Sequence, residues 1–399
     1  MKNSEKTLFF IIDTMGVGGA ETQLLRIIPY LTSLNWDIRL ITIKDKNEFR
    51  DELGKRGVAF SSLGFSSGFL AFARNVRLLV TEINKCKSRN RVIIHSHIVS
   101  SNLFSRFLTF FLSGSPVLVN TVHNTNEGSP LRYLMYKLTK NRVDFISAMS
   151  RSAIEVHQRK RVSRIDRLHL VHNGIDLNYF QKNVQVRDKM REDFKVSDAF
   201  VWLAVGNLSP QKNFANLLHA WKLLIQMTER NLRLFIIGEG AEKDKLQRFI
   251  LEHDLEDSVH LLGRRNDVQN MMNMADGYVM SSDWEGFPMV LLESAATQLP
   301  IVATDVGGNS EIVRDEISGY LCPPGNEHAL TESMKKIVEL PVEELEMMGR
   351  AGRKHVQENF SVESIAKQWN DIYESLLQQG MTDSNGLYKH PSEICQSRP

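Results

Sequence analysis

The chain has 399 residues, of which 42% are hydrophobic and 24% are charged, a composition typical of a soluble globular protein. This length favours two domains of ordinary size over one core. Three cysteines are scattered without metal-ligand spacing, and no segment approaches the roughly 18 apolar residues that a membrane-spanning helix needs. The scattered cysteines indicate free thiols in a reducing compartment. The first apolar run is too short for a signal peptide core, so we expect a cytoplasmic protein.

The net charge of +2 conceals an asymmetry between the two halves of the chain. Residues 1–190 hold 29 Lys and Arg against 15 Asp and Glu, whereas the remainder holds 20 against 32. Opposite signs indicate two domains with different partners.

Short apolar runs alternate with helical periods in the first half. This alternation predicts a parallel sheet with helices on both faces. The clearest helices are expected at Glu21–Leu34 and Phe69–Lys87. The expected strands are Leu8–Ile12, Ile38–Ile43, Val92–Ile94, Pro116–Val122, Phe145–Met149 and Leu168–Val171.

The second half repeats the pattern, which predicts an α/β protein of two Rossmann-like domains. Helices are expected at Phe214–Met227, Glu242–Glu252 and Met289–Thr297. The expected strands are Phe200–Val205, Leu232–Ile237, Val259–Leu261, Gly277–Met280, Pro300–Ala303 and Gly319–Leu321.

The domain boundaries follow from polar stretches and from the end of the pattern. The polar stretch 178–189 is expected to link domains at 1–177 and 178–380, because the charge balance changes sign there. Two helical periods, at 342–359 and 361–379, follow one another without a strand between them. Residues 381–399 have no periodicity and are expected to form a mobile tail.

A glycine-rich loop follows the first strand. Gly16, Gly18 and Gly19 allow the backbone to approach a ligand and to direct amides at it, although a plain tight turn also explains them. The dinucleotide-binding fingerprint needs another glycine where Glu21 stands, and Asp45 is a poor match for its acidic residue. The loop therefore argues against a nicotinamide cofactor.

Three histidines mark strand ends, where side chains of parallel sheets face a ligand crevice. His95 and His97 form an H-x-H pair, and His123 follows the next strand. A histidine here can bond a sugar hydroxyl or a phosphate, or move a proton. For His95 and His97 the sequence leaves a ligand-facing role and a structural role open. A metal site is disfavoured, because no further ligand joins the pair in sequence.

Two glycine turns follow strands in the second half. The segment V-G-N-L-S-P-Q-K-N-F, residues 205–214, precedes a helix and contains Lys212, which can place a positive charge beside a phosphate. The alternative is an ordinary solvated lysine at a helix start. The segment I-I-G-E-G, residues 236–240, brings Gly238 to a strand end.

Residues 281–293, S-S-D-W-E-G-F-P-M-V-L-L-E, are the most informative segment. Glu285 precedes a turn of Gly286, Phe287 and Pro288, and Glu293 follows in the next helix. Proline at or near the first helical position costs no hydrogen bond, and the positive end of the helix dipole suits a phosphate. A turn followed by an amphipathic helix would explain the apolar residues but not Glu285.

This spacing resembles the E-x7-E motif of retaining glycosyltransferases, specifically family 4 with the GT-B fold, and the similarity extends over almost the whole chain. The resemblance implies two Rossmann-like domains facing each other across a cleft, with the acceptor on the first and the donor on the second. It also implies that the last helix, about 361–379, crosses back onto the first domain.

The resemblance assigns roles to the residues above. Glu293 would hold the ribose of a nucleotide-sugar donor, Glu285 would lie beside the transferred sugar, and His123 would bond that sugar. Lys212 would stabilise the departing diphosphate, which Gly18 and Gly19 would face. The remaining donor-site residues implied are Asn207, Gly238, Gly286, Phe287 and Pro288. The family usually carries Arg where Asn207 stands, which puts the strength of diphosphate binding in question.

The implied reaction is transfer of a hexose or N-acetylhexosamine to a glycan or polyprenyl-linked acceptor in bacterial surface polysaccharide assembly, such as O-antigen or capsule. No D-x-D occurs in the sequence, so we expect no cofactor and no metal requirement. The alternatives are a nucleotide-sugar 2-epimerase of the same fold and a non-catalytic nucleotide-sugar-binding subunit.

The basic first half suggests an anionic membrane surface as a partner. Basic residues gather between Arg132 and Arg167, without the interleaved aromatics that nucleic-acid binding requires. The apolar stretch 103–112 lies nearby; Phe104, Phe107 and Phe111 either form the core face of a helix or are exposed to a leaflet. We expect peripheral association with the inner face of the plasma membrane.

Overall fold

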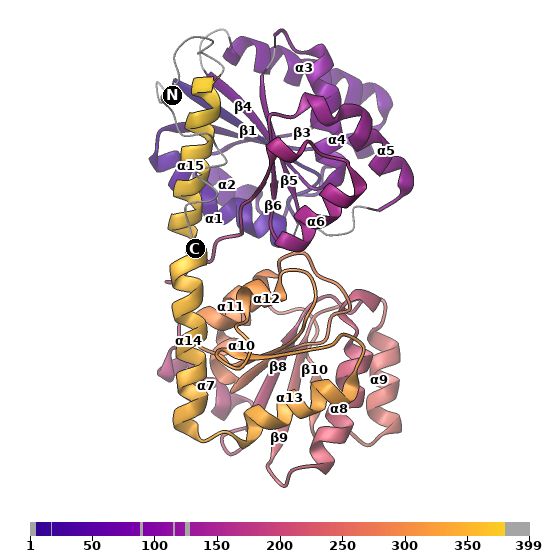
Figure 1. Ribbon diagram of the computed structural model, residues 1–399, viewed down its shortest axis with the longest axis vertical. Helices are drawn as coiled ribbons and strands as arrows, with labels where there is room; N and C mark the ends of the chain where they lie inside the picture. Colours follow the sequence, from indigo (N-terminus) through magenta and orange to yellow (C-terminus); the bar gives the residue numbers. More distant parts are fainter. Residues whose placement is uncertain (1–4, 17, 88–90, 115, 124–127, 380–399) are drawn as a thin grey trace. The chain divides into compact units, whose positions relative to one another are not determined.

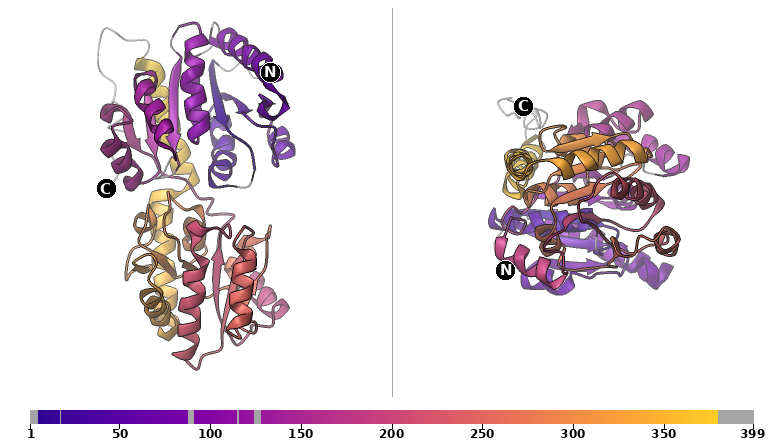
Figure 2. Two further views of the ribbon diagram at one scale, coloured as in Figure 1. Left: turned by 90° about the vertical axis from the view of Figure 1, so that its right-hand side faces the viewer. Right: turned by 90° about the horizontal axis from the view of Figure 1, so that it is seen from below.

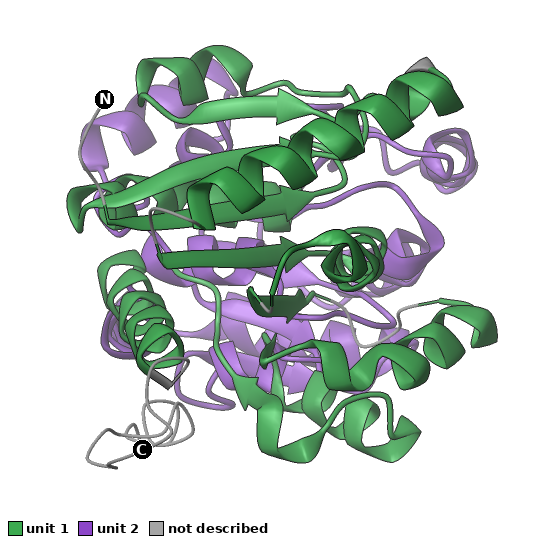
Figure 3. Ribbon diagram, turned by 90° about the horizontal axis from the view of Figure 1, so that it is seen from above, with its two compact units in different colours: residues 1–174, 362–399 green, residues 175–361 purple. Residues whose placement is uncertain are grey.

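The structure, a computed structural model, describes residues 5–16, 18–87, 91–114, 116–123 and 128–379. The chain divides into two compact units (Figure 3). Unit 1 comprises Met1–Gly174 together with Val362–Pro399, and unit 2 comprises Ile175–Ser361. The tail expected at 381–399 lies outside the described residues. No described helix is both long enough and apolar enough to cross a membrane.

Unit 1 contains a parallel sheet, of which β1, β3, β4, β5 and β6 are labelled in Figure 1. The strand order of this sheet is β3-β2-β1-β4-β5-β6-β7. The strand β3 was not expected, because its four residues, A-F-S-S, are partly polar and lie at the sheet edge. In chain order the strands are β1 (Lys6–Ile12), β2 (Trp36–Thr42), β3 (Ala59–Ser62), β4 (Arg91–His97), β5 (Val117–Val122), β6 (Phe145–Ala148) and β7 (Leu168–Leu170).

Helices cover both faces of this sheet (Figure 2). Successive side chains of a strand point to opposite faces, so Phe10 packs in a core with α1 and α15, whereas Phe9 packs in a core with α3 and α4. The helices are α1 (Gly19–Ser33), α2 (Arg50–Lys55), α3 (Phe69–Lys87), α4 (Val99–Leu108), α5 (Pro130–Thr139), α6 (Arg151–Lys160) and α15 (Val362–Gln379). Single 3-10 turns are η1 (Phe65–Ser67), η2 (Thr109–Phe111), η3 (Lys140–Arg142) and η4 (Ile165–Arg167).

The helix α15 belongs to unit 1 although it is the last helix of the chain. Its residues from Val362 to Leu377 pack in the same core as β1 and β2. Trp36 Nε1 donates to Asn370 at 2.9 Å, and Lys6 Nζ pairs with Glu374 at 2.6 Å. The fold of unit 1 is therefore completed by a segment distant in sequence.

Unit 2 contains a parallel sheet with the order β10-β9-β8-β11-β12-β13. Its strands are β8 (Phe200–Val205), β9 (Leu232–Ile237), β10 (Val259–Leu261), β11 (Gly277–Met280), β12 (Ile301–Thr304) and β13 (Gly319–Cys322). Its helices are α7 (Val184–Asp193), η5 (Pro210–Lys212), α8 (Phe214–Gln226), α9 (Lys243–Glu252), α10 (Val268–Met274), α11 (Met289–Ala296), α12 (Asn309–Ile312), α13 (Glu327–Glu339) and α14 (Val342–Phe360). The predicted α/β class with two Rossmann-like domains is confirmed.

The polar stretch 178–189, expected as a linker, instead contains most of α7. Arg187 and Arg191 on this helix both pair with Asp276, which immediately precedes β11. Arg187 also donates to the carbonyl oxygen of Ala275 at 2.7 Å. These contacts attach a polar helix to the sheet of unit 2, and local sequence carries no sign of them.

Candidate functional site

Both sheets reverse their strand order at one point, between β1 and β4 in unit 1 and between β8 and β11 in unit 2. In open parallel sheets, ligands bind outside the carboxyl ends of the strands at such a switch point. The predicted segments follow these strands: the glycine loop follows β1, and Lys212 and Glu285 follow β8 and β11.

Hydrogen bonds join the loop after β8 to the loop after β11. Ser281 Oγ donates to the carbonyl oxygen of Lys212 at 2.9 Å, and the Asp283 amide donates to that of Gln211 at 2.9 Å. Asn213 Nδ2 donates to Asp283 Oδ1 at 2.8 Å. The loops are thus fixed against each other, which holds the side chains of Lys212 and Glu285 at one place.

Lys212 and Glu285 form an ion pair, with 2.5 Å between Nζ and Oε1. The two side chains are only 18% and 7% exposed, so the pair is largely shielded from water. Ser282 Oγ donates to the same carboxylate oxygen at 2.6 Å. Sequence reasoning missed Ser282; its place three residues before Glu285, at a strand end, was the available signal.

The second carboxylate, Glu293, lies half-buried in the second turn of α11. Pro288 is the residue that caps this helix, with an extended backbone, and Met289 begins it. Burial first, and then the negative charges of Glu285 and Glu293, raise the pKa of Tyr278. The two glutamates of the motif therefore act on one buried phenol on β11.

Close backbone approaches explain the glycines of unit 2. At Gly238, φ is +153°, and an added Cβ would lie 1.8 Å from the carbonyl oxygen of Gly206. At Gly307, after β12, φ is +59°, and a Cβ would lie 2.2 Å from the carbonyl oxygen of Glu285. Any larger residue at either position would displace the loops that carry the ion pair.

The remaining predicted residues of unit 2 differ in what they offer a ligand. Asn207 is exposed at the end of β8. Gly286 accepts a hydrogen bond from the Gly308 amide at 2.8 Å. The ring of Phe287 is 5% exposed and packs edge-on against Phe360, with 5.4 Å between ring centroids. The Phe287 side chain is thus part of the core.

Unit 1 carries Gly18, Gly19 and His123. Gly18 precedes α1, and Gly19 begins it. A Cβ on Gly18 would lie 2.5 Å from Oε2 of Glu21, whose burial raises the pKa of its carboxyl group. Because this oxygen is the far end of a flexible side chain, the contact does not by itself require glycine, and both explanations of the loop stand.

The three histidines form two different arrangements. His95 is fully buried, and its ring nitrogens lie 2.6 Å from the Tyr373 hydroxyl and 2.7 Å from Thr121 Oγ1, which identifies it as a structural residue. His97 Nδ1 lies 3.1 Å from His123 Nε2. Burial lowers the pKa of His123 to about 3, so this ring is neutral near neutral pH.

Within the described part of the chain, no group of three or more His, Cys, Asp and Glu side chains is arranged to hold a metal ion. In the H-x-H pair, both ring nitrogens of His95 already take part in hydrogen bonds with side chains of the protein.

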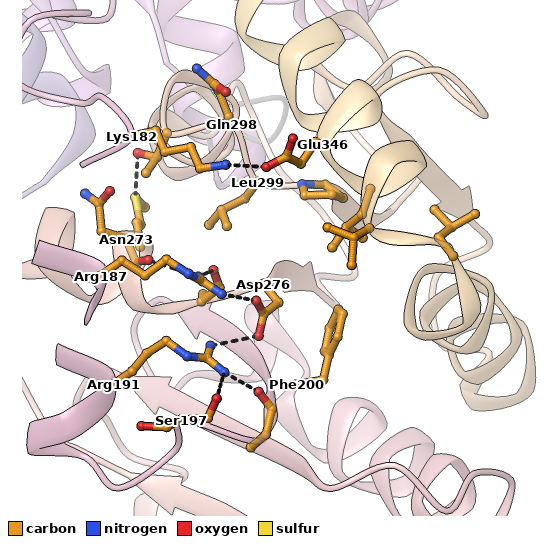
Figure 4. A pocket seen from close by; sticks show the side chains of 18 of the residues that line it. Lys182, Arg187, Arg191, Ser197, Phe200, Asn273, Asp276, Gln298, Leu299 and Glu346 are labelled. Atoms are coloured by element: carbon orange, nitrogen blue, oxygen red, sulfur yellow. Dashed lines mark hydrogen bonds and ion pairs between the residues drawn. The ribbon is translucent and has the colours of Figure 1, made fainter. Parts of the chain in front are cut away.

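A pocket of about 450 Å³ lies at the amino ends of β8, β11 and β12, opposite to the carboxyl ends (Figure 4). Most of its charged side chains form ion pairs with one another: Arg187 and Arg191 bind Asp276, and Lys182 binds Glu346 at 3.2 Å. We interpret this pocket as the structural junction of α7 with the sheet.

Two family models match the chain. Residues 186–355 match Glycosyl transferases group 1, and residues 17–179 match Glycosyltransferase Family 4. The Escherichia coli UDP-Gal:alpha-D-GlcNAc-diphosphoundecaprenol alpha-1,3-galactosyltransferase is 24% identical over 367 residues, which cover 90% of this chain and 94% of that protein. The Campylobacter jejuni N-acetylgalactosamine-N,N'-diacetylbacillosaminyl-diphospho-undecaprenol 4-alpha-N-acetylgalactosaminyltransferase is 27% identical over 342 residues, which cover 83% and 90%.

Among solved structures, Anabaena HepE in complex with UDP superimposes with a TM-score of 0.81 at 21% identity, over 92% of this chain and 100% of HepE. This likeness supports the fold. Since the two family matches together cover residues 17–179 and 186–355 and the two parallel sheets are those of GT-B proteins, the chain belongs to the glycosyltransferases of the group 1 and family 4 type.

Proposed function

We propose that this glycosyltransferase moves a hexose or N-acetylhexosamine from a nucleoside diphosphate sugar to a glycan or lipid-linked acceptor, with retention of anomeric configuration. The setting would be the assembly of a bacterial surface polysaccharide on the inner face of the plasma membrane. The names of the E. coli and C. jejuni relatives, both of which specify a diphosphoundecaprenol-linked acceptor, support such an acceptor here. The complex of HepE with UDP supports a uridine nucleotide in the donor.

The observation that carries the proposal is the shielded pair of Lys212 and Glu285 at the switch point of unit 2. In transfer, the acceptor oxygen bonds to the anomeric carbon while the bond from that carbon to the diphosphate oxygen breaks. The acceptor proton passes to the departing diphosphate. Lys212 would stabilise the charge that develops on that diphosphate, and Glu285 would position the sugar.

Negative charge accumulates on the leaving diphosphate during transfer, and a cation already held beside it stabilises that charge. The main catalytic contribution is therefore electrostatic. We therefore propose that Lys212 and the amino end of α11 meet this need without a metal ion. Transfer should persist in excess chelator. Complete loss that Mn²⁺ or Mg²⁺ restores would refute metal independence while leaving the transferase assignment intact.

The decisive experiment is incubation of the purified protein with a panel of radiolabelled nucleotide sugars and a short-chain polyprenyl-diphosphate glycan. The expected result is one donor whose label moves to the acceptor, with an α linkage from an α-linked donor by NMR. A β linkage would refute retention. Epimerised donor without acceptor would favour the 2-epimerase, and binding without any conversion would favour a non-catalytic subunit.

A further inference from the structure

The helix α5 in unit 1 exposes its apolar stripe to solvent. A helix on a globular protein usually buries the residues spaced at i, i+3, i+4 and i+7. In α5, Tyr133 and Tyr136 face the interior instead, at 8% and 0% exposure. The outward stripe, between 43% and 77% exposed, consists of Leu131, Leu134, Met135 and Leu138.

A second apolar surface lies on α4 and η2, next to α5. The end of α4 and the turn η2 expose the rings of Phe107, Phe110 and Phe111, each more than half exposed, whereas Phe104 is partly buried. The helices α4 and α5 pack together, and the buried Arg106 of α4 donates to the Tyr136 carbonyl at 3.3 Å. Of the two alternatives for the stretch 103–112, the exposed one therefore holds for Phe107 and Phe111.

A cationic pocket of about 490 Å³ lies between α5 and the end of α6. No acidic side chain among the described residues lines it, and Lys160 Nζ lies over the ring of Tyr133, 3.6 Å from its centroid. Leu134 of the apolar stripe also lines the pocket. The four cations are Lys137, Arg159, Lys160 and Arg161.

We propose that α5 is an interfacial helix and that this pocket binds the phosphate of an anionic phospholipid in the membrane leaflet. Exposed leucines beside a cluster of Lys and Arg are the features by which a helix lies in a lipid interface. Arginine side chains bind phosphate oxygens through hydrogen bonds of fixed geometry. Long-range electrostatic attraction to a negatively charged surface needs no such geometry. The inference rests on the proposed function, because a lipid-linked acceptor requires the enzyme at that surface.

The test is cosedimentation with two kinds of vesicle adjusted to equal surface potential. Both contain phosphatidylcholine; one carries its negative charge on phosphatidylglycerol and the other on oleate, a carboxylate. Tighter binding to phosphatidylglycerol is expected. Binding that is equal for the two vesicles would overturn the phosphate pocket, and absence of binding to either would overturn the membrane surface altogether.

Paired variants locate the effect. Arg159→Gln with Arg161→Gln should weaken binding to phosphatidylglycerol vesicles by about 25-fold, about fivefold for each cation removed. The matched control, Arg74→Gln with Arg77→Gln, removes the same charge from two exposed residues of α3 and should change binding little. An equal loss in both pairs would show long-range attraction and would refute the pocket.

Further measurements test the role of the apolar stripe independently of the proposed function. Leu131→Ser with Leu138→Ser should release the protein from both kinds of vesicle, and unchanged binding would refute the interfacial helix. These variants should transfer sugar to a water-soluble acceptor analogue as the wild type does. If the wild type itself transfers to no acceptor, the proposed function fails, whatever the vesicles show.

Discussion

Removing the charge of Lys212 tests how much the buried ion pair contributes. Lys212→Met keeps the apolar stem but leaves the carboxylate of Glu285, whose side chain is 7% exposed, without its cation. Breaking a buried pair on one side costs about 3–5 kcal/mol, and the 18% exposure of Lys212 favours the lower end. For a unit of this size, 3 kcal/mol corresponds to a fall in Tm of about 6–12 °C.

The assay is a double-mutant cycle by scanning calorimetry on the full chain. Glu285→Gln alone should also destabilise the protein, whereas the double variant should recover about 2 kcal/mol relative to the sum of the two single losses. Additive losses would mean that the pair behaves as an exposed one, and the shielded geometry would be refuted. In kinetics, Lys212→Met should lower kcat more than it raises KM, because the charge matters most as the diphosphate departs.

Three further outcomes follow from the structure. Glu293→Ala should weaken donor binding by about 1.5–3 kcal/mol, the loss of a charged hydrogen bond, by calorimetric titration; unchanged affinity would remove Glu293 from the site. Asn207→Arg, at an exposed position, should raise donor affinity about tenfold if it adds a charged hydrogen bond to the diphosphate. Burial lowers the pKa of His123 to about 3 and that of His157 to about 4, so only the unfolded chain takes up these protons as the pH falls below about 6.5. The free energy of unfolding, measured in urea, should therefore fall as the pH falls from about 6.5 toward 4, by up to about 1.4 kcal/mol per pH unit for each histidine. A His157→Gln variant with the wild-type pH slope would contradict this.

The strand bounds in unit 2 were predicted best, because apolar runs there end at glycines or polar residues. The bounds of β8 and β11 match the expected ones, because continuous apolar runs between glycines and polar residues define such strands. The strand β3 was missed, since an edge strand of four residues has no such run. The helix α7 was mistaken for a linker because Arg187 and Arg191 are fixed by Asp276, which lies far along the chain.

The candidate site was predicted as residues but not as contacts. The spacing from Glu285 to Glu293 is local, so it is legible in the sequence. The pairing of Lys212 with Glu285 joins positions 73 residues apart and depends on β8 and β11 being neighbours. For the same reason His95 could not be separated from His97 in advance, because its partner Tyr373 lies on the last helix.

The position of α15 has a consequence for synthesis of the protein. Unit 2 is one continuous stretch, whereas unit 1 is interrupted after Gly174 and resumes only at Val362. During translation the core of β1 and β2 must therefore wait for the final helix, with Trp36 and its apolar neighbours uncovered until Trp369 and Tyr373 arrive. A nascent chain in this state exposes apolar surface that chaperones recognise. A stop codon shortly before Val362 would spare unit 2 and leave unit 1 without one wall of its core.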